Sequence, residues 1–361
     1  MEFKTNNLQN IVKLLSLRGE QAEALRQEAR EVRLREAGDK VYLRGLIELS
    51  NICTKDCLYC GIRKSNLCVN RYTLTPEEVL QAADFAHKEG FGSIVLQSGE
   101  RRDEAFISLI EQLVREIMRQ SNGELGITLS LGEQSEETYR RWREAGAIRY
   151  LLRIETSDPV LYARLHPADH RFEERLDCLR RLRETGYYVG SGIMIGLPFQ
   201  STEQVARDLL FLKDLGVDMV GMGPYLEHEQ TPLWEYRNLI PSKEDRYELN
   251  LNALAVLRLL MPHINMAATT AMGTLHPDGR RASLYTASNV LMPNITPTLR
   301  RKDYSLYENK ICIYDSAQDS FQNIKKMIQE AECSLGLFEQ GNPLSESFLW
   351  NRAESNRRPN K

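Results

Sequence analysis

Three cysteines, Cys53, Cys57 and Cys60, form the run CxxxCxxC in a chain of 361 residues. Thiolates select soft metal centres, chiefly iron–sulfur clusters and zinc. Structural zinc normally takes four protein ligands, and the conceivable fourth ligands, Cys68 and His87, are poorly placed in the sequence. A [4Fe–4S] cluster on three cysteines keeps one iron open for a small molecule. The run therefore predicts an iron–sulfur site, with zinc or three simply packed cysteines as the alternatives.

Short β-rich runs alternate with longer amphipathic stretches along the chain. The runs are 41–50, 92–97, 126–131, 147–154, 188–195, 217–223, 264–270 and 288–293. Helical patterns cover 75–90, 201–216 and a polar region at about 8–37.

This alternation implies parallel strands joined by right-handed crossovers. Eight units fit a closed (β/α)8 barrel of the TIM type, and an open doubly wound sheet is the alternative, because a strand count cannot prove closure. The expected parts are an N-terminal helical extension (1–40), the barrel (41–312) and a C-terminal helical segment and tail (313–361).

In a barrel, catalytic residues should lie where strands end. The residues found at or after predicted strand ends are Cys53, Glu100, Glu133, Glu155, Met194, Thr269, Thr270 and Asn294. We therefore expect them to meet at one mouth.

Charge and hydropathy disfavour several classes of protein. The formal net charge of −3 gives no electrostatic reason to bind nucleic acid or an anionic membrane. No apolar run is long enough to span a bilayer, and the start MEFKTNNLQNIVKLL lacks a signal-peptide pattern. Seven cysteines, three of them clustered, suit a reducing compartment. The expected location is the cytoplasm, with neither nucleic acid nor a membrane as partner.

The cysteine run, with an aromatic residue before its last cysteine and a position after the first strand, resembles the signature of the radical S-adenosylmethionine (SAM) superfamily. Within it, the chain is similar to the HydE family of [FeFe]-hydrogenase maturases over roughly residues 40–312. The strings that carry this similarity are RYTLTPEE, IVLQSGE, TLSLGE, RYLLRIET, GLPFQ, DMVGMGP, ATTAMGT and VLMPN. Biotin synthase and 3-methylornithine synthase share the broader pattern but fewer of these strings.

The resemblance implies a catalytic metal centre on Cys53, Cys57 and Cys60. The open iron of a [4Fe–4S] cluster would chelate the amino and carboxylate groups of SAM. The cluster, once reduced by a low-potential electron donor, would cleave SAM to methionine and a 5′-deoxyadenosyl radical. Such a radical requires a cavity that excludes water.

The resemblance also implies SAM-binding residues. Glu100 would meet the methionyl amine, and Arg175 would pair with the carboxylate, since a guanidinium binds carboxylates bidentately. Glu155 would hydrogen-bond SAM and orient its neighbours. Glu100 could instead be an ordinary acidic loop residue, and Arg175 could form a salt bridge on a helix surface.

For the adenine, the family pattern implies backbone contacts from Tyr59 and an apolar wall from Met194 and Leu226. Both wall residues could simply belong to the core. For the substrate, it implies contacts near one cavity from Arg153, Thr269, Thr270, Tyr304 and Tyr307. The first three match a polar cradle for an amino-acid carboxylate. The threonines could otherwise be ordinary strand residues, and the tyrosines could be structural.

Two positions depart from the family pattern. Ile154 stands where many HydE members have histidine, which puts the substrate in doubt. Only Cys312 remains where some members bind an accessory cluster on three cysteines, so a second cluster is not expected. The other isolated thiols, Cys68, Cys178 and Cys333, are expected to be structural or incidental.

The leading hypothesis is a HydE-like enzyme acting on a small cysteine-derived or sulfur-containing substrate during assembly of the [FeFe]-hydrogenase active site. Its partners would be a small molecule with a carboxylate, a low-potential electron donor and other hydrogenase maturation proteins. A 3-methylornithine-synthase-like amino-acid mutase is the enzymatic alternative. A cluster carrier is the non-catalytic one, and it would never produce 5′-deoxyadenosine.

Overall fold

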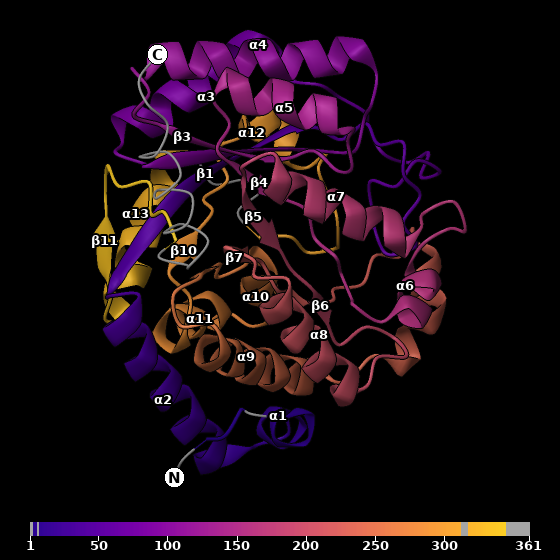
Figure 1. Ribbon diagram of the computed structural model, residues 1–361, viewed down its shortest axis with the longest axis vertical. Coiled ribbons are helices and arrows are strands. Elements are labelled where there is room, and N and C mark those ends of the chain that lie inside the picture. The colour runs from indigo at the N-terminus through magenta and orange to yellow at the C-terminus, as the bar shows by residue number, and fades with distance from the viewer. Residues whose placement is uncertain (1–2, 6, 312–316, 344–361) are drawn as a thin grey trace.

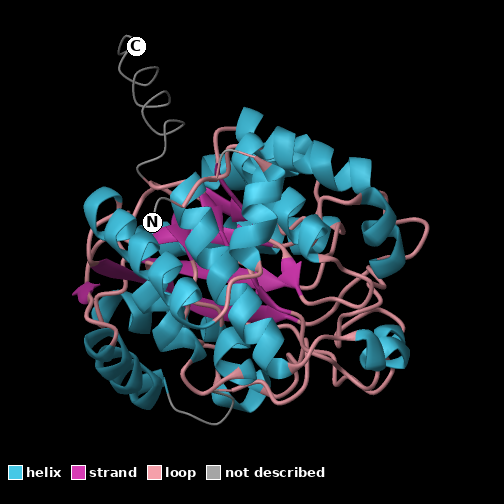
Figure 2. Cartoon of the chain, turned by 90° about the horizontal axis from the view of Figure 1, so that it is seen from below, coloured by secondary structure: helices cyan, strands magenta, loops and turns pink. Residues whose placement is uncertain are grey.

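A curled parallel β-sheet forms the centre of the molecule, and helices pack around it (Figures 1 and 2). The computed structural model describes residues 3–5, 7–311 and 317–343. Neighbouring strands follow the order β10-β1-β2-β3-β4-β5-β7-β9. Their bounds are β1 (Lys40–Ser50), β2 (Ser93–Ser98), β3 (Gly126–Ser130), β4 (Arg149–Leu151), β5 (Tyr188–Ser191), β7 (Met219–Val220), β9 (Asn265–Met266) and β10 (Val290–Leu291). The expected mixed α/β fold with a parallel sheet is confirmed.

Three further strands lie off this path. β6 (Met194–Ile195) and β8 (Gly223–Pro224) pair with each other. β11 (Ser334–Gly336) pairs in parallel with the start of β1.

Several helices begin at residues whose side chains cap them. The Thr75 hydroxyl oxygen accepts a hydrogen bond from the amide of Glu78, and the Glu78 carboxylate accepts one from the Thr75 amide. Ser201 and Gln204 form the same capping box. The helices are α1 (Leu8–Leu15), α2 (Gly19–Glu36), α3 (Pro76–Lys88), α4 (Glu104–Gln120), α5 (Glu136–Ala145), α6 (Pro159–Leu165), α7 (Phe172–Glu184), α8 (Thr202–Asp214), the 3-10 helix η1 (Pro232–Leu239), α9 (Lys243–Leu260), α10 (Thr270–Leu275), α11 (Gly279–Thr286), α12 (Thr298–Arg301) and α13 (Ala317–Glu330). No helix in the described ranges has both the length and the apolar character needed to cross a membrane.

Every predicted β-rich run contains at least one strand, and the patterns at 75–90 and 201–216 correspond to α3 and α8. The runs 188–195 and 217–223 each contain two short strands instead of one. A Cβ on Gly192 would lie 2.0 Å from the carbonyl oxygen of Gly221. The two backbones therefore approach each other too closely at this point for a side chain.

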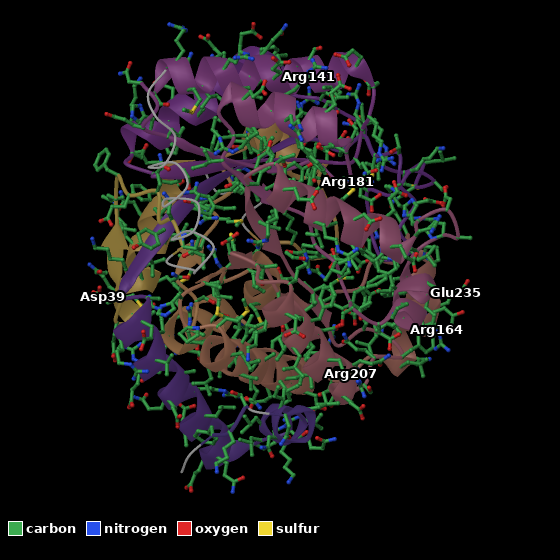
Figure 3. All side chains as sticks on the ribbon, viewed as in Figure 1. Asp39, Arg141, Arg164, Arg181, Arg207 and Glu235 are labelled. Atoms are coloured by element: carbon green, nitrogen blue, oxygen red, sulfur yellow. The ribbon has the colours of Figure 1, made fainter. Side chains whose placement is uncertain are left out.

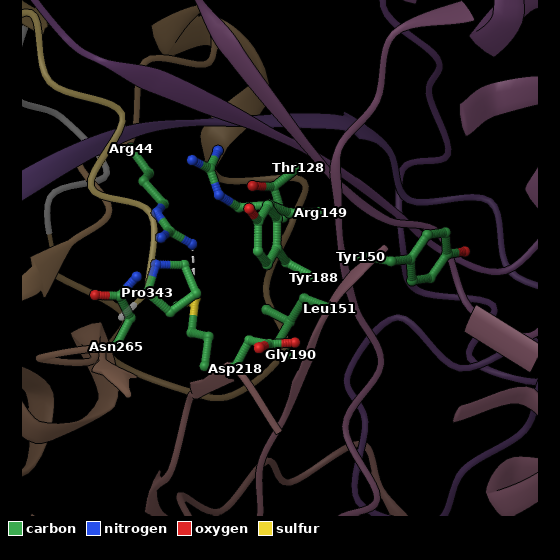
Figure 4. Close-up of a pocket in the computed structure, with 11 residues that line it drawn as sticks. Arg44, Thr128, Arg149, Tyr150, Leu151, Tyr188, Gly190, Asp218, Asn265 and Pro343 are labelled. Atoms are coloured by element: carbon green, nitrogen blue, oxygen red, sulfur yellow. Dashed lines mark hydrogen bonds between the residues drawn. The ribbon is translucent and has the colours of Figure 1, made fainter. Parts of the chain in front are cut away.

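A small cavity lies among the amino-terminal ends of the strands, lined in part by Arg44, Arg149, Met219 and Asn265 (Figure 4). Arg44 and Arg149 donate hydrogen bonds to backbone carbonyls of the C-terminal segment 340–343, at 3.3 and 2.9 Å. This segment thus covers one end of the sheet. The cysteines follow the carboxyl end of β1, so the candidate chemistry lies at the opposite end.

Candidate active site around the cysteine loop

The cysteines lie in the loop that follows β1 and are half-buried. The backbone amides of Lys55 and Glu100 donate to the Cys53 sulfur at 3.4 and 3.3 Å. A Cβ on Gly99 would lie 2.4 Å from the carbonyl oxygen of Ile52. Only glycine therefore lets the loop after β2 approach the cysteine loop this closely.

The three thiols lie near enough to influence one another. Burial raises the pKa of Cys53 and Cys60, and it raises the pKa of Cys57 to about 12. Negative charge on one cysteine further raises the pKa of the others: Cys53 acts on Cys57, and both act on Cys60. Three thiolates at this place therefore need a positive centre, which would displace their protons on binding.

The donor set fits a cluster better than a single zinc ion. Across the described part of the chain, no three or more His, Cys, Asp or Glu side chains are arranged around one metal-ion position. Zinc requires ligands that share one ion, whereas three thiolates on a [4Fe–4S] cluster each bind a different iron.

A buried charge network borders the loop and centres on Glu133, which follows β3. Its Oε1 accepts from Arg175 Nε at 2.6 Å, and its Oε2 accepts from Lys55 Nζ at 2.8 Å and Arg102 Nη2 at 3.1 Å. Burial by itself raises the pKa of Glu133, but Arg175 and Lys55 outweigh it and hold the pKa at about 2. Glu133 is therefore ionised at neutral pH.

Glu100 lies beside this network. Its Oε2 accepts the Glu133 amide at 2.8 Å, and its Oε1 lies 3.1 Å from Arg102 and 3.6 Å from Lys55. Oε1 makes no well-directed hydrogen bond to any described residue, although the atom is buried. Burial and the charge of Glu133 raise the pKa of Glu100. A cationic ligand group at Oε1 would stabilise its ionised form.

Glu155 has a positive φ of 67°, an uncommon conformation for a residue other than glycine. Its amide donates to the Gly192 carbonyl at 3.0 Å, and its carbonyl accepts from Met194 at 3.0 Å. Its Oε2 lies 3.0 Å from Arg153 Nη2. Burial raises the pKa of Glu155, while Arg153 and Arg175 lower it. Glu155 therefore places a buried carboxylate close to two arginines.

Arg175 belongs to α7, yet it is only 7% exposed. Its Nη1 donates to the carbonyl of Arg153 at 2.5 Å, and its Nε binds Glu133. The alternative of a salt bridge on the helix surface is therefore wrong. Ile154, between Arg153 and Glu155, is fully buried in the main hydrophobic core.

Two of the expected adenine contacts share one small apolar cluster. Met194 is buried in it, and Tyr59 packs against it together with Leu58 from the cysteine loop. Leu226 is not a member of this cluster among the residues that the structure describes. Tyr59 and Met194 are thus brought together, and Tyr225, the neighbour of Leu226 in the chain, belongs to the same cluster.

The expected substrate residues lie in segments that follow different strands of the sheet. Thr269 occupies the N-cap position of α10 without a capping hydrogen bond from its side chain. Its Oγ1 is buried and has no hydrogen-bond partner among the described residues. Thr270 is the first residue of α10. Tyr304 accepts from Gln97 Nε2 at 3.2 Å. Tyr307 is close enough to Arg153 for the arginine to affect the tyrosine pKa, which burial raises.

Several residues of this site carried no assigned role in the sequence. Glu133 is one of the residues found at strand ends. It follows β3 as Glu100 follows β2, and this shared position could have indicated that Glu133 belongs to the site. Lys55 lies inside the cysteine run itself. Arg102 and the histidines His166 and His170 had no signal, because their partners are remote in the chain. Cys312 lies outside the described residues.

Comparisons with a family model and with known proteins agree on one family. The model of the Radical SAM superfamily matches residues 47–212. The [FeFe] hydrogenase maturase subunit HydE of Thermotoga maritima is 45% identical over 308 residues, which cover 85% of this chain and 85% of that protein. The 3-methylornithine synthase of Methanosarcina acetivorans is 27% identical over 325 residues, covering 88% and 86%.

A solved structure agrees with these sequence matches. The crystal structure of methylornithine synthase superposes with a TM-score of 0.77 at 26% identity and covers 94% of this chain and 95% of that one. The curled parallel sheet is therefore shared by a protein of similar length.

Proposed function

Because the chain belongs to the radical SAM superfamily, in the family of the maturase HydE, we propose that it is a HydE-like maturase. It would act on a small cysteine-derived or sulfur-containing substrate during assembly of the [FeFe]-hydrogenase active site. The observation that carries this proposal is the 45% identity to HydE, spread over 85% of both chains.

Members of the superfamily use a [4Fe–4S] cluster and SAM, which supply a 5′-deoxyadenosyl radical when bound. Cys53, Cys57 and Cys60 would hold the cluster. Two buried amide donors already point at Cys53, and such bonds stabilise a thiolate.

Glu100, Glu155 and Arg175 would hold SAM. The buried Oε1 of Glu100 suits an ammonium group, since a charged donor compensates a carboxylate better than a neutral one. Arg175 is already oriented by Glu133 and the Arg153 carbonyl, which would aim its remaining Nη2 at a carboxylate. Tyr59 would supply backbone contacts to the adenine, and Met194 and Leu226 would form an apolar wall beside it.

Arg153, Thr269 and Thr270 would bind the substrate carboxylate, with Tyr304 and Tyr307 beside it. The orphaned Oγ1 of Thr269 supports this role, because a buried hydroxyl without a partner costs free energy that an anionic ligand would offset.

We also propose that the sheet closes as a complete barrel. The single parallel bridge between Ala267 and Val290 supports closure, since it joins the end of β9 to β10. The proposed division remains an extension (1–40), a barrel (41–312) and a C-terminal part (313–361), although its last boundary lies outside the described residues. The protein would work in the cytoplasm. Its partners would be a low-potential electron donor and other hydrogenase maturation proteins.

The test is anaerobic reconstitution with iron, sulfide, SAM and reductant, followed by assay of 5′-deoxyadenosine. The assay compares a synthetic cysteine-bound iron carbonyl–cyanide complex with no substrate, and Cys53→Ala serves as the blank. Strong stimulation by the complex, with a new iron-centred paramagnetic species, is the expected result. The maturase role fails if the reconstituted enzyme cleaves SAM at the same rate with and without the complex.

A second candidate is an amino-acid mutase, favoured by the match to methylornithine synthase over nearly the whole chain. The same arginine and threonines would bind an amino-acid carboxylate. Stimulation of SAM cleavage by free amino acids, but not by the iron complex, would favour the mutase.

A further inference from the structure

The segment between α6 and α7 holds three consecutive residues of the cysteine loop. The contacts are Leu58 N to the Leu165 carbonyl at 2.9 Å, Tyr59 OH to His166 Nε2 at 3.3 Å, and Cys57 Sγ to His170 Nδ1 at 3.8 Å. These residues are more than 100 positions apart in the chain. The end of α6 and the segment that follows it therefore contact the part of the loop that carries Cys57.

The hydrogen bonds of His166 define its tautomer. Its Nδ1 lies 2.9 Å from the carbonyl oxygen of Tyr162, and a carbonyl can only accept. Nδ1 therefore carries the proton, and Nε2 accepts from the hydroxyl of Tyr59. Burial lowers the pKa of His166 to about 3, so the ring stays neutral, and it stacks on Tyr162 with centroids 3.9 Å apart.

His170 lies four residues further along this segment and is only 7% exposed. Its backbone amide donates to the Pro167 carbonyl at 2.9 Å, and its ring centroid lies 5.9 Å from that of His166. A cysteine that ligates iron is a thiolate, which has no proton to donate. The contact with Cys57 must then run from the Nδ1–H of His170 to the sulfur.

We propose that His170 is a positioning residue for the cluster, donating Nδ1–H to the Cys57 thiolate and thereby raising the cluster's reduction potential. This inference rests on one part of the proposed function, namely that Cys57 binds a [4Fe–4S] cluster. Reduction adds negative charge, part of which resides on the cysteine sulfurs. An N–H group directed at a sulfur stabilises the reduced state more than the oxidised one, and such bonds are an established lever on cluster potential.

The experiment is a redox titration of the reconstituted enzyme without substrate, with dithionite as reductant and the signal of the reduced cluster read by electron paramagnetic resonance. His170→Phe keeps a ring but removes the donor, and its midpoint potential should be more negative than that of the wild type. His170→Asn keeps an N–H close to the position of Nδ1 and should restore most of the difference. His87→Phe is the matched control, since His87 binds Glu124 on the surface, and it should leave the potential unchanged.

A wild-type potential in His170→Phe, at full iron and sulfide content, would overturn the inference. If this variant does not bind a cluster, the wild-type enzyme labelled with ¹⁵N-histidine gives the answer. A weak ¹⁵N coupling to the reduced cluster is expected, and its absence would equally overturn the inference. Failure of the wild type to bind any [4Fe–4S] cluster would instead refute the proposed function itself.

Discussion

Replacing Glu133 by glutamine should remove a buried carboxylate that pairs with three cations at the site. Arg175, Lys55 and Arg102 all bind it, at 2.6, 2.8 and 3.1 Å, and its side chain is only 2% exposed. Glutamine keeps the size and one acceptor oxygen but no charge. Arg175 would then remain buried beside a neutral group, and an uncompensated buried charge is strongly destabilising.

The pKa of Glu133 sets the size and the pH window of this effect. The folded-state value of about 2 lies below the unfolded value of about 4.3, and each pKa unit corresponds to about 1.4 kcal/mol, which gives about 3 kcal/mol. Because the folded pKa is depressed, the stabilisation is fully present above the unfolded pKa and is lost as the pH falls towards about 2. For a chain of this length, about 3 kcal/mol corresponds to a Tm lower by about 4 °C.

Urea unfolding of the cluster-free protein at a series of pH values measures this difference, because acid would release iron from the loaded enzyme. Glu133→Gln should unfold with about 3 kcal/mol less free energy than the wild type at pH 7, and the gap should close between about pH 4 and pH 2. Glu136→Gln is the matched control: it breaks an exposed pair with Arg140 and should cost at most about 1 kcal/mol.

Two results would refute the reasoning about Glu133. Equal stability of the variant and wild type at pH 7 would mean that the network adds no net stability. A gap of unchanged size from pH 7 to below pH 3 would mean that the loss comes from packing and not from the charge of Glu133.

Three further predictions concern the cysteine loop and the mouth of the site. Gly99→Ala should lower both thermal stability and iron content, because its Cβ would lie 2.4 Å from a backbone oxygen. Gly221→Ala is the control and should change neither, because its Cβ meets nothing within 4 Å. Thermal unfolding and iron analysis of both variants measure the difference. Cys57→Ala should abolish SAM cleavage, and 5′-deoxyadenosine above the reagent blank would contradict the cluster assignment. Replacing Thr269 and Thr270 by valine should remove substrate stimulation yet spare slow uncoupled SAM cleavage, and equal loss of both rates would indicate a structural role.

The strands and the helices within 8–37, 75–90 and 201–216 could be predicted because their signals are local. The capping box at Thr75 and Glu78 and the eight β-rich runs each lie within a few residues, and the structure contains all of them. The split of two runs at Gly192 and Gly221 could not be predicted, since it depends on the approach of two backbones that are remote in sequence. The three-residue strand β11 is too short to show a pattern of its own.

For the candidate site, the sequence identified the types of residue but not their partners. Arg175 was expected to pair with a ligand or to lie on a helix surface, because its immediate neighbours on α7 are charged. Its actual partner is Glu133, 42 residues away. An ion pair between residues that follow different strands depends on how the sheet curls. A local sequence pattern does not predict this curl.

This long-range pairing has a consequence for how the site works. Lys55 lies between Cys53 and Cys57, and through Glu133 it is joined to Arg175. Ion pairs therefore connect the loop proposed to hold the cluster with an arginine proposed to hold SAM, before either group binds. If that connection matters, Glu133→Gln should weaken SAM binding more than it lowers iron content. The cysteines keep their amide hydrogen bonds, whereas Arg175 loses the charged partner at its Nε. A loss of iron that fully accounts for the loss of SAM binding would argue that the two parts of the site act independently.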